Sequence, residues 1–144
     1  MFDSILVVCV GNICRSPIGE RLLKRLMPEK TISSAGVSAL VGKPADEMAV
    51  IVSIENNLSL EGHVACQLTR KQCLEYDLIL VMEKKHQEIV CNIAPEVRGK
   101  VMLFGHWNNQ ESIGDPYRKS KEFFELVYGQ LNTSALTWAE KLNR

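Results

Sequence analysis

Short apolar runs alternate with amphipathic segments along the chain, and this pattern predicts strands alternating with helices. The run Ile5–Val8 is wholly apolar, which is typical of a strand buried on both faces of a parallel sheet. Further strands are predicted at residues 31–35, 78–82 and 101–104. Helices are predicted from Ser16 to a stop at Pro28, over 46–57, from Thr69, over 84–93 and over 124–142.

Three of these helices carry specific signals. Ser16 is a good N-cap residue, and Pro17 is tolerated at the first helical position. Thr69 and Gln72 have the spacing of a capping box. The last helix is the clearest, because apolar residues recur at helical spacing at Phe124, Tyr128, Leu131, Ala135, Trp138 and Leu142.

The order of these elements predicts an α/β fold. Strands that alternate with helices favour a parallel sheet covered on both faces, and 144 residues without a linker or a repeat fit one domain. We therefore expect residues 1–144 to form a single three-layer domain around a four-stranded parallel sheet. Such sheets bind ligands at the carboxyl ends of their strands, so the loop after the first strand is the first candidate site.

Composition and charge narrow the class of protein. The 17 basic and 17 acidic residues cancel, whereas binders of nucleic acid or anionic membranes usually carry a basic excess. No apolar run reaches the ~20 residues that cross a bilayer, and the N-terminal segment does not resemble a signal peptide. We therefore expect no nucleic acid partner, no membrane insertion and a cytoplasmic location, where the five cysteines stay reduced. The spacing of cysteines and histidines indicates no metal site, no motif indicates a cofactor, and His86 and His106 are interpreted as surface or packing residues.

The loop after the first strand has the residues that an anion-binding site needs. Its sequence is Cys9-Val10-Gly11-Asn12-Ile13-Cys14-Arg15-Ser16. Backbone N–H groups of such a loop form a nest for phosphate oxygens, and the helix that follows points its positive end at the same place. Gly11 and Asn12 are suited to the left-handed backbone angles of a tight nest. Arg15 supplies a planar fork for two phosphate oxygens.

Cys9 is the candidate nucleophile of this loop. The helix end and Arg15 favour its thiolate form, and Ser16 can donate a hydrogen bond to the sulfur. The alternative is a buried cysteine next to an arginine on the surface. The functional interpretation is favoured, because the loop joins the end of a strand to the start of a helix and contains both the Gly-Asn pair and the Arg-Ser pair.

The segment Cys9–Pro17 resembles the signature of the low-molecular-weight protein tyrosine phosphatases. Asp115-Pro116-Tyr117 resembles the acid loop of that family, and Ser34-Ala35-Gly36 and His63-Val64-Ala65 also match. The resemblance spans essentially the whole chain. It implies hydrolysis of phosphotyrosine through a phosphocysteine intermediate, without a metal or another cofactor.

The resemblance also implies a role for each of these residues. Cys9 is expected to attack phosphorus, Arg15 to clamp the transition state and Asp115 to protonate the leaving phenolate. Ser34 and His63, together with Asn12 and Ser16, are expected to hold the loop rigid. The residues expected to bind the substrate are Val10, Gly11, Asn12, Ile13, Cys14, Ser16, Leu40 and Tyr117. Cys14 is also a candidate redox partner of Cys9.

Residues next to the motifs refine the resemblance. Leu40, Val41 and Tyr117 are expected to form an apolar cleft that suits an aromatic ester. Arg118 stands where eukaryotic members tend to carry a second aromatic residue. This arrangement resembles the enterobacterial phosphatases that are paired with a tyrosine autokinase in capsule or exopolysaccharide export. The implied partner is the tyrosine-rich C-terminal tail of such a kinase.

Two other functions remain open. A thiol-coupled arsenate reductase has a similar loop, but Cys66 and Cys73 precede the third strand, where its relay cysteines are not expected. A non-catalytic phosphotyrosine-binding or phosphoryl-carrier module would need no acid such as Asp115. Cys66 and Ser33 also stand where the family often has Arg and Asp, which predicts the loss of one structural ion pair.

Overall fold

Four parallel strands form the centre of the computed structural model, which describes residues 2–143. The strands are β1 (Ser4–Cys9), β2 (Thr31–Gly36), β3 (Leu78–Val81) and β4 (Val101–Leu103). Their order in the sheet is β2-β1-β3-β4, so β1 lies between β2 and β3. The predicted parallel sheet is confirmed, with every strand within one residue of its expected ends.

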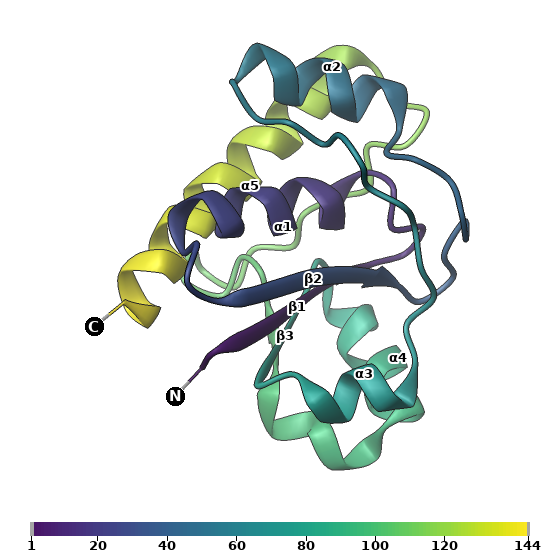
Figure 1. Cartoon of the computed structure of the whole chain (residues 1–144), viewed down its shortest axis with the longest axis vertical. Helices are drawn as coiled ribbons and strands as arrows, with labels where there is room; N and C mark the ends of the chain where they lie inside the picture. Colours follow the sequence, from purple (N-terminus) through teal and green to yellow (C-terminus); the bar gives the residue numbers. More distant parts are fainter. Residues whose placement is uncertain (1, 144) are drawn as a thin grey trace.

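Helices cover both faces of this sheet (Figure 1). On one face lie α1 (Arg15–Leu26), α2 (Glu47–Glu55) and α5 (Lys121–Leu142). On the other face lie α3 (Arg70–Glu75), α4 (Lys84–Ile93) and the 3-10 helix η1 (Pro95–Lys100). The predicted three-layer α/β architecture is confirmed. None of the helices within residues 2–143 is long and apolar enough to cross a membrane.

The central strand β1 contributes to both halves of the core. Ile5 and Val7 pack in the layer that contains α1, α2 and α5, whereas Leu6 and Val8 pack in the layer that contains α3 and α4. All four side chains are fully buried. An unbroken apolar run is therefore required here, and it fixes the position of Cys9 at the end of the strand.

Helix α1 begins one residue earlier than predicted. It starts at Arg15, and Cys14 is its N-cap residue without a side-chain cap hydrogen bond. The predicted N-cap role of Ser16 is therefore wrong. The Ser16 hydroxyl is used elsewhere, because it accepts a hydrogen bond from Asn12 and lies against the sulfur of Cys9.

Two other helix starts follow their capping residues. Thr69 and Gln72 form the predicted capping box at the start of α3, which is confirmed. Helix α5 begins at Lys121, three residues before Phe124, because the hydroxyl of Ser120 caps it. Its start is therefore set by a polar cap that precedes the apolar repeat.

Candidate active site

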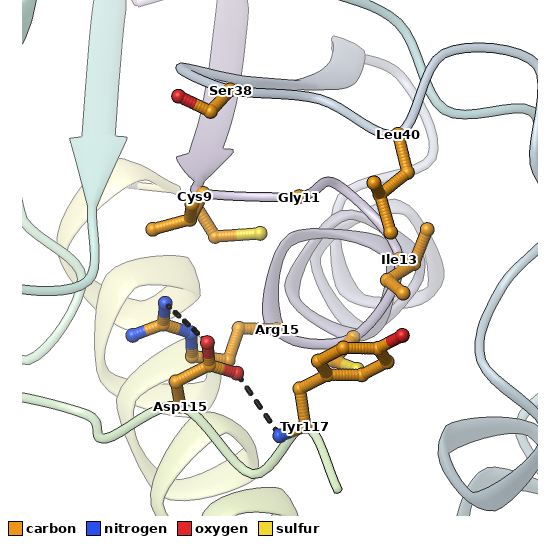
Figure 2. A pocket seen from close by; sticks show the side chains of 10 residues that line it. Cys9, Gly11, Ile13, Arg15, Ser38, Leu40, Asp115 and Tyr117 are labelled. Atoms are coloured by element: carbon orange, nitrogen blue, oxygen red, sulfur yellow. Dashed lines mark hydrogen bonds and ion pairs between the residues drawn. The ribbon is translucent and has the colours of Figure 1, made fainter.

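A pocket of about 190 Å³ opens at the carboxyl edge of the sheet, next to the end of β1 (Figure 2). It is lined by Cys9, Val10, Gly11, Ile13, Cys14, Arg15, Ser38, Leu40, Asp115 and Tyr117. The structure therefore places the predicted nucleophile, the predicted clamp and the predicted acid in one cavity, although Asp115 lies 100 residues from Arg15 in the sequence.

The loop after β1 presents its backbone N–H groups to this pocket. Its outer side is joined to the segment after β2, where the N–H groups of Val37, Ser38 and Leu40 donate to the carbonyls of Cys9, Val10 and Gly11, each at 3.0 Å. Within the described part of the chain, no N–H group of residues 10–14 donates a hydrogen bond. Consecutive unpaired N–H groups at a helix start are suited to binding a phosphate.

Asn12 gives the loop its shape. Its φ of 60° is left-handed, as predicted, whereas Gly11 does not have a positive φ and that prediction is wrong. Nε2 of His63 lies 2.6 Å from the backbone oxygen of Asn12. The N–H of Cys66 donates to Asn12 Oδ1 at 2.9 Å. These contacts hold a backbone conformation that L-residues otherwise avoid.

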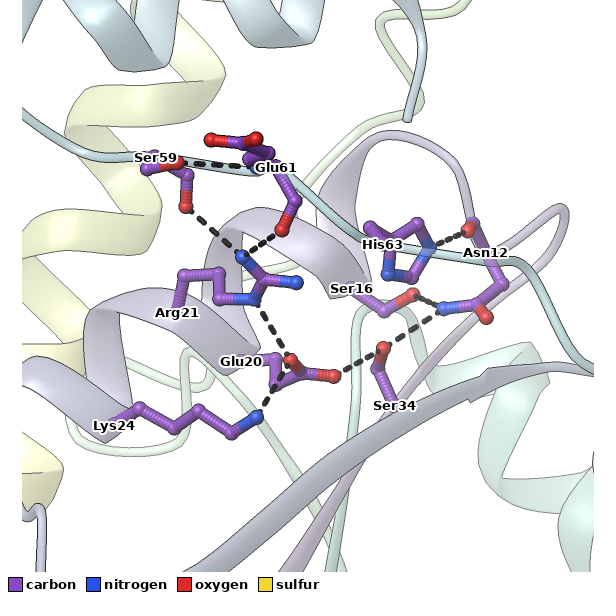
Figure 3. Close-up of polar contacts among 9 residues, drawn as sticks. All are labelled: Asn12, Ser16, Glu20, Arg21, Lys24, Ser34, Ser59, Glu61 and His63. Carbon is purple, nitrogen blue, oxygen red and sulfur yellow. Dashed lines mark hydrogen bonds and ion pairs between the residues drawn. The ribbon is translucent and has the colours of Figure 1, made fainter. Parts of the chain in front are cut away.

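The amide of Asn12 also orients the hydroxyl next to the nucleophile (Figure 3). Asn12 Nδ2 donates to Ser16 Oγ at 2.7 Å and to Ser34 Oγ at 3.0 Å. Because Ser16 Oγ accepts from Asn12, its own proton is free to point at Cys9 Sγ, 3.0 Å away. Of the predicted support residues, Ser16 therefore contacts the sulfur of Cys9, and Asn12 connects Ser16 to Ser34.

Glu20 terminates this chain of hydrogen bonds. The hydroxyl of Ser34 donates to Glu20 Oε1 at 2.7 Å, and the carboxylate of Glu20 is paired with Arg21 at 3.0 Å and with Lys24 at 3.2 Å. Figure 3 shows these residues as one cluster behind the loop. The nucleophile is therefore connected to a charged group one turn further along α1.

Cys66 and Ser33 are the two residues at which the sequence predicts the loss of a structural ion pair. They lie beside Ser34 and His63 in a second, polar pocket of about 350 Å³. The thiol of Cys66 donates to the backbone oxygen of Ser34 at 3.3 Å. The thiol of Cys66 therefore contacts β2, the strand that carries Ser34.

The Arg15 side chain is buried, with 2% of its surface exposed, and its guanidinium contacts three other residues. Its Nη1 donates to the backbone oxygen of Ile113 at 2.8 Å and lies 3.5 Å from Glu83 Oε2. Its Nη2 lies 3.9 Å from Asp115 Oδ2. The shorter contacts are on Nη1, so the Nη2 edge of the guanidinium is the one more available to an anion.

Asp115 stands at the mouth of the pocket. Its side chain is half exposed, and its Oδ1 accepts from the N–H of Tyr117 at 3.0 Å. Figure 2 shows the carboxylate between Arg15 and Tyr117, across the pocket from Cys9. A carboxyl group at this position can exchange a proton with a group bound above the sulfur.

The sequence predictions missed four contributors to the site and placed three residues in the pocket that do not line it. Two of these, Asn12 and Ser16, are fully buried behind the pocket, where they support the loop. Val41 does not line the pocket and its side chain is largely exposed, so its predicted place in the cleft is wrong. The missed contributors are Ser38, which lines the pocket, Glu20, Glu83 and the backbone oxygen of Ile113. Only Glu83 had a signal, because it is an acidic residue directly after the buried run 78–82.

Cys14 lies in the pocket wall without acting as a thiolate. Its side chain is buried. Burial, followed by the negative charge of Asp46, raises the pKa of its thiol well above the ordinary range. All five cysteines are free thiols, and within residues 2–143 no group of three or more His, Cys, Asp or Glu residues could hold a metal.

Comparison with known proteins places this geometry in a family. The model of the low molecular weight phosphotyrosine protein phosphatases matches residues 4–144. AmsI of Erwinia amylovora, named a probable low molecular weight protein-tyrosine-phosphatase, is 60% identical over 100% of both chains. The low molecular weight protein-tyrosine-phosphatase Wzb of Escherichia coli K12 is 62% identical over 99% of this chain and 97% of its own. The solved structure of Vibrio vulnificus Wzb in complex with benzylphosphonate matches with a TM-score of 0.97 at 55% identity, and the match covers 99% of this chain and 100% of that one.

Proposed function

The chain belongs to the low-molecular-weight phosphotyrosine protein phosphatase family, and we propose that Cys9, Arg15 and Asp115 carry out its protein-tyrosine phosphatase reaction. The observation that carries this proposal is the single pocket in which these three side chains meet the unpaired N–H groups of residues 10–14. A nucleophile, an anion site and a proton donor are the parts that transfer of a phosphoryl group to a thiolate needs.

In the first step, Cys9 Sγ attacks the phosphorus of phosphotyrosine. The S–P bond forms while the bond from phosphorus to the phenolic oxygen breaks, and its electron pair goes to that oxygen. Asp115, protonated at this stage, gives its proton to the leaving oxygen. Arg15 and the loop N–H groups bind the equatorial phosphoryl oxygens, where negative charge gathers in the transition state.

In the second step, a water molecule attacks the phosphocysteine. Asp115, now a carboxylate, takes a proton from the water as the new P–O bond forms. The S–P bond breaks and its electron pair returns to Cys9 Sγ. The hydroxyl of Ser16, 3.0 Å from this sulfur, stabilises the departing thiolate by a hydrogen bond. Inorganic phosphate is the product.

The pocket walls favour an aromatic ester. Ile13, Leu40 and Tyr117 surround the space above Cys9, and a phenyl ring can lie between them while its phosphorus reaches the sulfur. The side chain of phosphoserine is shorter and lacks the ring. We therefore expect phosphotyrosine peptides to be hydrolysed much faster than phosphoserine peptides.

The relatives support a proposal for the partner. Wzb of Escherichia coli K12 and AmsI of Erwinia amylovora are 62% and 60% identical to this chain. We propose that the substrate is the tyrosine-rich C-terminal tail of a bacterial tyrosine autokinase for capsule or exopolysaccharide production. We also propose a cytoplasmic location, where such a tail is accessible and the five thiols stay reduced.

An arsenate reductase function receives no support from the cysteine positions. A thiol relay needs further cysteines that reach the nucleophile. Apart from Cys9, only Cys14 lines the pocket, whereas Cys73 and Cys91 are buried in the layer that contains α3 and α4. Cys66 faces the second pocket, behind the loop.

The test is turnover of a phosphotyrosine peptide in EDTA, without a reductase. Cys9→Ser should abolish release of phosphate and prevent trapping of a labelled phosphoenzyme, while still binding the peptide. Cys66→Ser, as the matched control, should keep at least half of the parent activity. Substantial turnover by Cys9→Ser, or a requirement for a thiol reductant in each catalytic cycle, would refute the proposed chemistry.

A further inference from the structure

His86 is a buried histidine behind the catalytic pocket. It lies in the first turn of α4, and its side chain is fully buried. The N–H of Glu83 donates to His86 Nδ1 at 3.2 Å. In the neutral ring one nitrogen accepts and the other carries the proton. Because Nδ1 accepts, the proton of His86 is on Nε2.

Nε2 of His86 lies next to the carboxylate that contacts Arg15. His86 Nε2 lies 3.1 Å from Glu83 Oε2, and the same oxygen lies 3.5 Å from Arg15 Nη1. The N–H is not well aligned with this oxygen, and Nε2 has no other hydrogen-bond acceptor within residues 2–143. A buried donor without another partner strongly favours keeping the carboxylate at this place.

The surroundings of His86 keep the ring neutral. Burial, followed by the positive charge of Arg15, lowers the pKa of His86 to about 4. Lys85 acts in the same direction, while Glu83 and Asp115 act against it. At neutral pH the ring therefore carries no charge, and its Nε2 lies beside the carboxylate of Glu83 as a neutral donor.

We propose that His86 is a positioning residue, which holds the carboxylate of Glu83 against Nη1 of Arg15 and thereby aligns the guanidinium plane for the transition state. This inference rests on the clamp role proposed above for Arg15. The carbonyl of Ile113 fixes one N–H of the guanidinium, and a single hydrogen bond permits rotation about itself. Asp115 restrains the plane less than Glu83 does, because it lies farther away, 3.9 Å from Nη2, on a half-exposed side chain. The second contact, from Glu83, defines the plane, and planar alignment is what distinguishes binding of the transition state from binding of a ground-state anion.

Two substitutions test the roles of the two ring nitrogens of His86 separately. His86→Asn keeps an acceptor at the place of Nδ1 for the N–H of Glu83, but removes the donor at the place of Nε2. His86→Gln places an amide near Nε2 and is a frequent residue at this position of a capping box. Gln72→Leu is the matched control, because it breaks the equivalent bond of the α3 capping box, from the N–H of Thr69 to Gln72 Oε1, outside the catalytic pocket.

The decisive readout is the inhibition constant of orthovanadate, a mimic of the trigonal-bipyramidal transition state, against that of inorganic phosphate. For His86→Asn we expect the vanadate constant to rise about tenfold and kcat/KM for an aryl phosphate to fall about tenfold, with the phosphate constant within about twofold of the parent. His86→Gln should recover to within about threefold on all measures. Gln72→Leu should leave the ratio of the two constants unchanged.

Three results would overturn the inference. The ratio of vanadate to phosphate binding could stay within twofold of the parent in His86→Asn. His86→Gln could be as impaired as His86→Asn, which would assign the effect to packing. Gln72→Leu could shift the ratio equally. Arg15→Ala, measured in parallel, separates the two proposals: if it is active, the clamp role itself fails, whereas an inactive Arg15→Ala beside an unaffected His86→Asn refutes only the role of His86.

Discussion

Arg15 Nη1 donates a hydrogen bond to the backbone oxygen of Ile113 at 2.8 Å, across 98 positions of sequence. The N–H of Ile113 in turn donates to the backbone oxygen of Met82, just after β3, at 2.9 Å. Ile113 is fully buried, and Asp115 follows two residues later. The segment that carries the proposed acid is therefore fastened both to the sheet and to the proposed clamp.

Substitution of Arg15 should remove most activity. We expect Arg15→Ala to lower kcat at least 10²-fold, as loss of a transition-state donor typically does. Arg15→Lys should recover little, because an ammonium cannot bind Ile113 and two phosphoryl oxygens in one plane. Steady-state kinetics with an aryl phosphate would measure both. A kcat for Arg15→Lys within tenfold of the parent would contradict a planar clamp.

Asp115→Asn should slow substrates with poor leaving groups most. General acid catalysis is typically worth ~10²–10⁴ in rate, and phenols of high pKa gain most from protonation. The rate of the variant should fall steeply as the leaving-group pKa rises, whereas the rate of the parent should change little. Equal slopes for the two enzymes, under conditions where the absence of a burst shows that phosphocysteine formation limits the rate, would exclude Asp115 as the acid. Glu111 is a poor substitute, because its carboxylate accepts from Gln130 on α5 at 2.8 Å.

Brief peroxide treatment should join Cys9 to Cys14. Peroxide oxidises Cys9 to a sulfenic acid, and the thiol of Cys14 then displaces water to form the disulfide. Since burial raises the pKa of Cys14, the second reaction should be slow at neutral pH and accelerate as the pH rises. Peptide mass spectrometry with and without dithiothreitol would follow it. Detection of sulfinic or sulfonic acid alone at Cys9 would exclude a protective role for Cys14.

His86 should make the fold sensitive to mild acid. The pKa of His86 is about 4 in the folded protein and 6.5 in an ordinary environment, so the unfolded chain binds the additional proton between these values. Acidification from pH 7 to pH 5 should therefore lower the free energy of unfolding by ~2 kcal/mol through this residue. Urea titrations at both pH values should show a correspondingly smaller loss for His86→Gln. An identical loss in both proteins would show that His86 titrates normally.

Gly36 should not tolerate a side chain. A Cβ at this position would lie 2.4 Å from the backbone oxygen of Val10, which belongs to the anion-binding loop. Gly36→Ala should therefore displace the loop and lower kcat/KM by at least 10²-fold. Gly129→Ala is the control, because nothing lies within 4 Å of its Cβ and alanine in a helix is favoured by up to ~1 kcal/mol. A fully active Gly36→Ala would show that the loop can shift without loss of function.

The repeating elements and the local motifs of this protein could be predicted from the sequence, because their signals lie within a few residues. The strands follow from short buried runs, and the capping box of Thr69 and Gln72 follows from a spacing of three. The N-cap prediction for Ser16 failed, because a tertiary contact with Cys9 competes for its hydroxyl. Capping preferences depend only on neighbouring residues in the sequence, so they could not predict this competition.

The residues around Arg15 could not be predicted from the sequence, because long-range packing brings them together. Ile113 acts through its backbone oxygen, which any residue would supply. Glu20 reaches the site only through Ser34 and Asn12. Glu83 could have been found from the fold alone, since it follows a strand whose carboxyl end had to face the site.

The position of β1 between β2 and β3 has a consequence for how the enzyme loses activity. Its amide groups pair with strands on both sides and its apolar side chains are buried on both faces. Amide hydrogen exchange in such a strand requires opening of the whole molecule, whereas exposed loops exchange through local fluctuations. Cys9 ends this strand, so fraying at the chain termini cannot release the nucleophile. Loss of turnover while the amides of β1 remain protected therefore reports a local change in the site, whereas loss of both reports global unfolding.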